Sequence, residues 1–162
     1  MQHIEAMAKK ILTVAEAQKM IQAWKLIGKT ISFTNGCFDI LHPGHIFSLG
    51  QAAKEADYLI VGLNSDASVQ RLKGPTRPVN TTESRAIILA NLTIVDMVVV
   101  FEEDTPLELI KALLPDVLVK GGDYTIDQIV GAKEVVAAGG KVIINSIVEG
   151  FSTTNIIDKI KH

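Results

Sequence analysis

The segment FTNGCFDILHPGH, residues 33–45, brings two histidines, a glycine and an aspartate together in one short stretch. Pro43 predicts the first turn of a helix there, so the imidazole rings of His42 and His45, three residues apart, can face the same spot. Free N–H groups at a helix N-terminus favour anions, and Gly44 allows a phosphate to approach the backbone closely. Because none of these groups is a nucleophile, the pattern predicts stabilisation of a phosphate during direct displacement at phosphorus.

Two other interpretations of this stretch compete with a phosphate site. Histidines near an apolar helix are often structural, and Asp39 with His42 and His45 could form a two-histidine, one-carboxylate site for iron or zinc. The whole sequence contains only four histidines and one cysteine, so no further cluster supports a metal centre. The sequence therefore favours the phosphate site, and we expect no metal held by the protein itself.

The composition limits the class of protein. The chain has 162 residues, of which 48% are hydrophobic and 21% are charged, as expected for one globular domain over residues 1–162. A net charge of -2 argues against general binding to nucleic acid or to an anionic membrane, so any anion site must be local. The single cysteine, Cys37, and the lack of a long apolar run predict a cytoplasmic protein without an intramolecular disulfide.

Short apolar segments alternate with amphipathic ones along the chain, which predicts the elements that position this stretch. Strands that are apolar on both faces and separated by helices indicate a parallel sheet covered on both sides, a Rossmann-like α/β sandwich of about five strands. Residues 1–30 are expected to form an N-terminal helical extension. The expected strands are 30–33, 58–64, 95–101, 116–122 and 141–147, and the expected helices are 14–27, 42–56, 84–92, 105–114, 126–140 and 152–160.

Ligands of such sheets bind outside the carboxyl ends of the strands, and polar residues follow two of the expected strands there. Lys120 precedes two glycines and Asp123, and is a candidate to neutralise a phosphate. Asn64 and Asp66 end another strand, although an Asx turn is an equal interpretation of that pair.

Residues 65–83 are expected to be a polar loop of unusual length. It carries Arg71, Lys73 and Arg77, so it could be a mobile basic lid over a ligand. Arg85, just beyond it, is expected to be either a ligand contact or a surface charge at a helix start. There is no P-loop, and no G-x-G-x-x-G follows the first strand, so neither common nucleotide signature applies.

Two motifs resemble signatures of the cytidylyltransferase-like nucleotidyltransferases. GCFDILHPGH is similar to their first signature, whose H-x-G-H binds the nucleoside triphosphate, and GFSTTNII at 150–157 resembles the second. Ser-Thr-Thr alone is a good helix cap, but paired with the first signature it predicts a second phosphate cradle. Segments between 31 and 160 are similar, in order, to the branch of the family that makes ADP-heptose. Ile147 stands where glycerol-phosphate cytidylyltransferases carry an arginine, which makes a cytidine product less expected.

This resemblance implies transfer of AMP from ATP, with Mg²⁺, to D-glycero-β-D-manno-heptose 1-phosphate, in the synthesis of a lipopolysaccharide core precursor. It implies that His42, His45 and Lys73 are catalytic. The nucleotide-binding residues that it implies are Asn35, Gly36, Cys37, Phe38, Asp39, His42, Gly44, His45, Lys120, Gly121, Ser152, Thr153 and Thr154. The acceptor-binding residues that it implies are Asn64, Asp66, Arg77 and Asp123.

Alternatives remain open at this point. The enzyme could use CTP, or transfer to another phosphorylated acceptor such as glycerol 3-phosphate, or the protein could bind a nucleotide without turnover. We expect a homodimer or larger homo-oligomer and no nucleic-acid or membrane partner. Many members of the ADP-heptose branch are fused behind a sugar kinase for which this chain has no room, so we expect the heptose kinase to be a separate protein.

Overall fold

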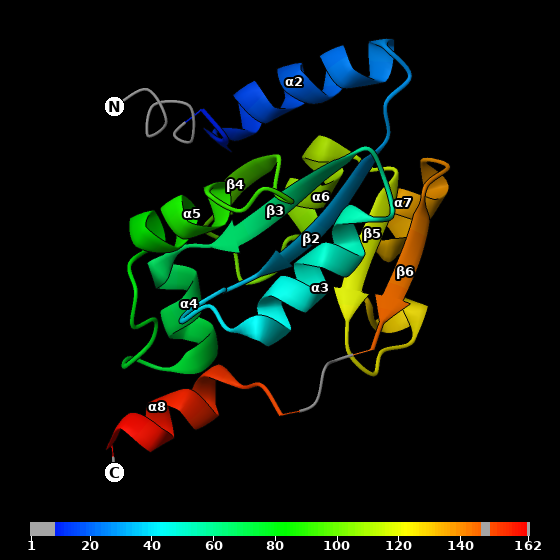
Figure 1. Ribbon diagram of the computed structural model, residues 1–162. Helices are drawn as coiled ribbons and strands as arrows, with labels where there is room; N and C mark the ends of the chain where they lie inside the picture. Colours follow the sequence, from blue (N-terminus) through cyan, green and yellow to red (C-terminus); the bar gives the residue numbers. More distant parts are fainter. Residues whose placement is uncertain (1–8, 147–149, 162) are drawn as a thin grey trace.

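The computed structural model describes residues 9–146 and 150–161 (Figure 1). The first eight residues of the expected extension and Ile147 therefore lie outside the described residues. The strands are β1 (Ile11–Leu12), β2 (Ile31–Gly36), β3 (Tyr58–Asn64), β4 (Met97–Phe101), β5 (Val117–Gly121) and β6 (Lys141–Asn145). The helices are α2 (Val14–Leu26), α3 (Pro43–Ala53), α4 (Asp66–Lys73), α5 (Thr82–Ala90), α6 (Leu107–Leu113), α7 (Ala132–Ala137) and α8 (Thr153–Lys161), with a 3₁₀ turn at Ile126–Gln128.

The strands form one parallel sheet in the order β1-β4-β3-β2-β5-β6. The chain moves from β2 outward through β3 to β4, and then returns to place β5 on the other side of β2. The strand order thus reverses beside β2, and such a switch point is where open parallel sheets form a ligand crevice. The predicted α/β fold is confirmed, with one strand more than the sequence suggested.

Helices cover both faces of the sheet. On one face, Ala17 and Ile21 of α2 pack with α6 and α7 against residues such as Phe33 and Leu118. On the other face, Leu49 of α3 packs with α5 against the sheet. Figure 1 shows α8 apart from both layers, on the side to which the arrowheads of β5 and β6 point. The carboxyl ends of the strands therefore face α8, and the site must lie between them.

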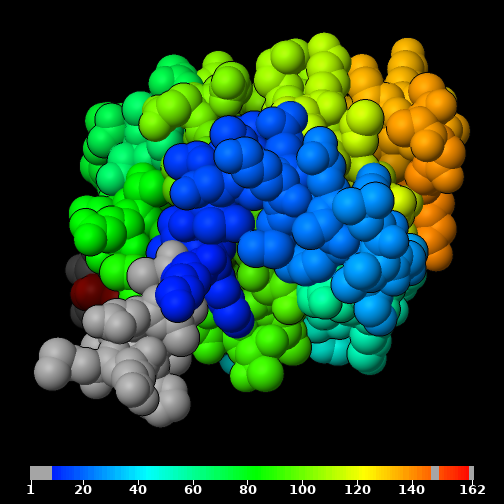
Figure 2. Space-filling model, turned by 90° about the horizontal axis from the view of Figure 1, so that it is seen from above, coloured from blue at the N-terminus to red at the C-terminus, as the bar shows by residue number. Residues whose placement is uncertain are grey.

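The N-terminal part of the described chain supplies the edge strand β1 and the covering helix α2. Thr13 and Glu16 make the predicted capping box, which starts α2. Figure 2 shows α2, in blue, lying across the outer surface of the molecule. The added strand β1 has two residues, too few for an alternating pattern to be visible in the sequence, and it pairs with β4. No helix of the described residues is long and apolar enough to cross a bilayer.

The prediction of one uninterrupted loop over residues 65–83 is wrong, because its first half is helix α4. The hydroxyl oxygen of Ser65 accepts a hydrogen bond from the N–H of Ser68 and so caps the helix, while Val69 is fully buried. Only residues 74–81 connect α4 to α5. This shorter connection lies close to the end of β2, since it makes hydrogen bonds to Asp39 just beyond that strand.

The single helix expected over 126–140 is also wrong, because the chain breaks at Gly131. This residue has φ +85°, a left-handed conformation that favours glycine, and a Cβ there would lie 2.6 Å from Cδ1 of Ile110. The 3₁₀ turn ends before Gly131 and α7 begins after it. The break lets α7 pack closely against α6.

Gly131→Ala is expected to destabilise the fold more than Gly139→Ala. Both glycines have positive φ, +85° and +88°, so both alanines carry a left-handed penalty of about 1–2 kcal/mol. A Cβ at Gly139 meets nothing within 4 Å, whereas the overlap with Ile110 adds about 1–3 kcal/mol at Gly131. Urea unfolding of the two variants measures the difference, and equal losses would show that Ile110 moves aside freely.

Candidate active site

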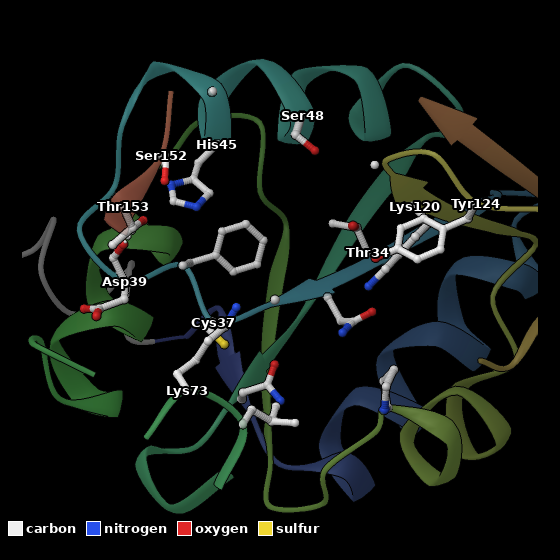
Figure 3. Close-up of a pocket in the computed structure, with 18 of the residues that line it drawn as sticks. Thr34, Cys37, Asp39, His45, Ser48, Lys73, Lys120, Tyr124, Ser152 and Thr153 are labelled. Atoms are coloured by element: carbon white, nitrogen blue, oxygen red, sulfur yellow. Dashed lines mark hydrogen bonds between the residues drawn. The ribbon is translucent and has the colours of Figure 1, made fainter. Parts of the chain in front are cut away.

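A cleft of about 670 Å³ opens at the carboxyl ends of β2 and β5, between the first turns of α3 and α8. Its size lies within the usual range of small-molecule sites. Figure 3 shows His45, Ser152, Thr153 and Asp39 gathered at one end, and Lys120 with Tyr124 at the other. The predicted site residues that line the cleft are Asn35, Gly36, Cys37, Phe38, Asp39, His42, Gly44, His45, Asn64, Lys73, Arg77, Lys120, Gly121, Ser152, Thr153 and Thr154.

The two histidines lie on the same side of the helix start, as their spacing predicts, and their rings also stack on each other. Their ring centroids lie 3.8 Å apart with 22° between the planes, and Phe38 packs against His45 with centroids 5.5 Å apart. The backbone N–H of His42 donates to Nδ1 of His45 over 3.4 Å. In a neutral ring, the proton of His45 is then on Nε2, which leaves this nitrogen as a hydrogen-bond donor.

Both imidazoles are weaker bases than a free histidine, because their pKa values are lowered. The pKa of His45 is lowered to about 4, mainly by burial and also by the neighbouring His42, while Asp39 opposes the shift. Burial also lowers the pKa of His42. The pair is therefore neutral near pH 7, so it can donate hydrogen bonds to a phosphate without carrying a charge of its own.

The low pKa of His45 predicts that stability falls in mild acid. Between pH 6.5 and about 4 the unfolded chain takes up a proton at this residue that the folded chain does not, so the free energy of unfolding decreases as the pH falls through this range. Urea unfolding across the same range should give a shallower pH dependence for His45→Asn than for the wild type. Parallel curves for the two proteins would contradict the lowered pKa.

The start of α8 is held against the loop that follows β2. The hydroxyl of Thr153 donates to the backbone oxygen of Asp39 over 2.9 Å, which joins the two signature motifs directly. Phe151 lies against the first turn of α3, since a Cβ on Gly44 would lie 2.9 Å from Cβ of Phe151. The ring of Phe151 is parallel to that of His42 within 15°. The space beside Gly44 is thus filled by these two side chains.

Asp39 faces away from open solvent. Its side chain is 1% exposed, and its carboxylate accepts hydrogen bonds from Nε of Arg77 and from the backbone N–H groups of Val79 and Asn80. Burial alone would raise the pKa of Asp39, but these three donors together hold it below its usual value. The flanking residues Phe38 and Ile40 both have positive φ, +47° and +49°, a strained backbone that turns this carboxylate inward.

This geometry does not assemble the rival metal site. The carboxylate of Asp39 is surrounded by donors, and Nδ1 of His45 accepts from the backbone. Across residues 9–146 and 150–161 there is no group of three or more His, Cys, Asp or Glu side chains that could hold a metal ion. A role of Asp39 at the nucleotide, directly or through a metal, stays a prediction that these contacts do not support.

Lys120 lies at the carboxyl end of β5 and projects into the cleft opposite the histidines (Figure 3). Burial lowers the pKa of its ammonium group, with a smaller opposing effect from Cys37. In the described part of the chain no ion pair involves this ammonium group. A half-buried cation without an anion is costly by itself, so the arrangement suits an anionic ligand.

The other predicted residues have different surroundings. Lys73 lies exposed at the end of α4 and lines the cleft, near Cys37 (Figure 3). Burial raises the pKa of the Cys37 thiol, which makes a nucleophilic thiolate there unfavourable. Asn64 lines the cleft but donates its side-chain N–H to Ser68. Asp66 and Asp123 lie outside the lining of the cleft, and their acceptor role stays a prediction.

The prediction that Arg85 is a ligand contact or a surface charge is wrong, because the structure buries this side chain completely. Its guanidinium group bonds to the backbone oxygens of Cys37, Asn64 and Asn80, and to the side chain of Asp66. A lone arginine at a helix start carries no sequence signal for such burial. Ser48 and Tyr124 also line the cleft and were missed, although Ser48 lies one helical turn after His45 and the 3.6-residue period could have indicated it.

Comparisons with known proteins find a family and relatives that this sequence resembles. The sequence pattern of the family described as Cytidylyltransferase-like matches residues 33–159. The chain is 58% identical over 151 residues to a protein of Paramagnetospirillum magneticum named Bifunctional protein HldE, covering 93% of this chain and 31% of that protein. It is 59% identical to the protein of the same name from Mesorhizobium japonicum, again over 151 residues. The chain thus spans about a third of the length of the curated relatives that it matches.

Two examples illustrate the solved structures that share the fold. One is the lipopolysaccharide core biosynthesis protein from Thermoplasma volcanium, with a TM-score of 0.60, 28% identity, and coverage of 75% of this chain and 98% of that chain. The other is pantoate-beta-alanine ligase from Francisella tularensis, with a TM-score of 0.60 and 18% identity. The second likeness concerns the fold alone.

Proposed function

Because the chain belongs to the cytidylyltransferase-like family, we propose that it is an adenylyltransferase that transfers AMP from ATP to D-glycero-β-D-manno-heptose 1-phosphate. The products are ADP-heptose and pyrophosphate. The observation that carries the proposal is a cleft with a neutral histidine pair at one end and, at the other, Lys120, a cation that has no ion-pair partner among the described residues. Such a cleft offers phosphate contacts to two ligands at once.

The choice of heptose phosphate rests on similarity. The segments between 31 and 160 resemble the ADP-heptose branch of the family, and relatives at 58% and 59% identity carry the name HldE. The structural neighbour from Thermoplasma volcanium is titled a lipopolysaccharide core biosynthesis protein. These names support a sugar phosphate as the acceptor.

The proposed reaction is one displacement at phosphorus. An oxygen of the heptose 1-phosphate attacks the α-phosphorus of ATP, the bond from that phosphorus to the bridging oxygen breaks, and pyrophosphate leaves with the electron pair. Nε2–H of His45 donates to an oxygen of the α-phosphate, whose charge grows as the bond forms. His42, Ser152 and Thr153 hold the triphosphate at the helix N-termini, and Lys120 neutralises a phosphate at the far end.

Magnesium fits this scheme as part of the substrate, MgATP. The described residues hold no carboxylate cluster for a resident ion, and Mg²⁺ commonly binds through substrate phosphates with few protein ligands. The chain's own residues then orient the phosphates around the ion that accompanies them.

We also propose that the chain forms a homo-oligomer and that a sugar kinase supplies the heptose 1-phosphate.

Pyrophosphate release tests this proposal most directly. The purified protein is assayed with ATP and CTP against heptose 1-phosphate, glycerol 3-phosphate, pantetheine phosphate and FMN. We expect the highest kcat/KM for ATP with heptose 1-phosphate. Preference for CTP or for another acceptor would replace the proposed substrates, and tight ATP binding without turnover on any acceptor would indicate a binding protein.

Lys120→Met is expected to weaken activity without weakening the fold. Loss of one charge-assisted hydrogen bond to a phosphate costs about 1.5–3 kcal/mol, which corresponds to a roughly 10- to 150-fold increase in the KM of the ligand that Lys120 contacts. Removal of a half-buried cation that no carboxylate within residues 9–146 and 150–161 pairs with should leave the Tm unchanged or raise it. Steady-state kinetics with each substrate varied shows which ligand is affected.

Lys133→Met, at an exposed lysine of α7, serves as the matched control. A lower Tm together with an unchanged KM in Lys120→Met would show that this lysine stabilises the fold instead of binding a phosphate.

A further inference from the structure

The guanidinium group of Arg77 is held in place through one of its nitrogen atoms, Nε. Its Nε donates to Oδ2 of Asp39 over 2.9 Å, and its side chain is only 14% exposed. It lines the cleft, and none of the hydrogen bonds within residues 9–146 and 150–161 uses its two terminal NH₂ groups. The guanidinium group therefore keeps a pair of donors for a ligand, in the fork geometry that suits phosphate.

The backbone that follows Arg77 is held by two side chains of opposite charge, Asp39 and Arg85. The carboxylate of Asp39 accepts from the N–H groups of Val79 and Asn80, at 2.9 and 3.0 Å. The carbonyl of Asn80 in turn accepts from Nε of Arg85 over 3.0 Å. One buried anion and one buried cation thus hold consecutive backbone groups of a segment that has no regular secondary structure of its own.

Arg85 also connects this segment to the sheet. Its Nη1 donates to the backbone oxygen of Asn64, at the end of β3, and to that of Cys37, directly after β2, at 2.8 and 2.7 Å. The contacts of Asp39 and Arg85 together join residues 77–80 to two strand ends across the cleft wall.

From these contacts we infer that Asp39 and Arg85 are positioning residues that hold residues 77–80 so that Arg77 presents its terminal NH₂ groups to a phosphate of the bound ligands. The inference rests on the proposed function for the identity of those ligands. Asp39 acts through Arg77 and does not touch the nucleotide or its metal, because three donors and almost complete burial leave its carboxylate inaccessible.

A double-mutant cycle separates this role from a direct one. Arg77→Gln should weaken binding of the ligand that Arg77 contacts roughly tenfold or more, as expected for a lost charge-assisted bond. Asp39→Asn should produce a loss of similar size, because the amide has one acceptor oxygen where the carboxylate uses two, so its NH₂ group must face one of the three donors, and because the negative charge beside Arg77 is lost. The double variant should lose no more ligand affinity than Arg77→Gln alone, because Asp39 affects the ligand only through Arg77.

The measurements are the Kd of MgATP by calorimetry and the KM of heptose 1-phosphate, with Arg71→Gln as control. Arg71 is an exposed arginine of the same region that pairs with Asp104 and lies outside the lining of the cleft. Hydrogen exchange at the N–H groups of Val79 and Asn80 reports on the fixed segment without any ligand, and it should become faster in Asp39→Asn.

Several results would overturn the inference. Losses that multiply in the double variant would mean that Asp39 touches a ligand or its metal directly, and a shifted Mg²⁺ dependence in Asp39→Asn would mean the same. Arg77→Gln with both constants unchanged would remove the ligand role of Arg77, and unchanged exchange at Val79 and Asn80 would remove the positioning role of Asp39. If the wild type binds ATP but turns over no heptose 1-phosphate, the proposed function fails, while the cycle in ATP affinity and the exchange rates still test the positioning.

Discussion

His45→Ala is expected to lower kcat by about 10²–10³, the usual cost of losing one preorganised donor to a transition state. The ring of His45 is oriented before any ligand arrives, by stacking on His42 and by the hydrogen bond to its Nδ1. Its low pKa, about 4, keeps it a neutral donor at physiological pH. Because the charge that it stabilises develops mainly during the reaction, the affinity for ATP should change much less than kcat.

Steady-state kinetics, ATP calorimetry and thermal unfolding of this variant test the expectation together. His42→Ala should lower kcat in a similar way and weaken ATP binding more, if His42 holds the phosphates of the ground state. A structural role of His45 would instead lower the Tm together with all binding, and a metal site would give a transition metal that elemental analysis finds and that either substitution removes. Near-normal turnover in His45→Ala would rule out the proposed mechanism.

Arg85→Met is expected to lower the free energy of unfolding by about 3–5 kcal/mol, the typical cost of removing one partner from a buried charged network. The methionine fills much of the same volume but leaves the carbonyl oxygens of Cys37, Asn64 and Asn80 without their donor. Asp66 also loses its cation. Arg85→Lys should recover part of the loss, because an ammonium group can reach one or two of these acceptors.

Urea unfolding of the two variants measures this effect, and Arg71→Met provides the comparison. Arg71 also pairs with a carboxylate, but its side chain is 49% exposed, and exposed ion pairs contribute only about 0–1 kcal/mol. A loss at Arg85 no larger than the loss at Arg71 would mean that water replaces the guanidinium group at these carbonyls.

The sequence predicts the part of the site that is made by residues close together in the chain or at the end of one strand. His42 and His45 are three positions apart on one helix, so their spacing fixes their common direction as soon as the helix is recognised. Lys120 follows an apolar strand, and parallel strands end at one edge of the sheet, which explains why its place in the cleft is predictable.

The part that the sequence does not predict depends on contacts between distant residues. Asp39 meets its three donors 38 to 41 positions away, and Arg85 meets Cys37 48 positions away. Nothing local indicates that these charged residues are buried, because each charge is compensated by a segment whose path is set by the whole fold. The break at Gly131, between the 3₁₀ turn and α7, is not predictable from local sequence either, because the close contact there is with Ile110 of another helix.

Because the histidine pair is neutral, uncharged and charged side chains of the cleft have different expected roles. In the proposed reaction, uncharged imidazoles exert no long-range attraction on ATP, so we expect that attraction to come from Lys73, Arg77 and Lys120, which line the same cleft. Dissolved salt weakens attraction between full charges, but it acts little on a short hydrogen bond formed inside a closed complex. Increasing ionic strength should therefore make substrate capture slower and weaker, while the chemical step of the bound complex keeps its rate.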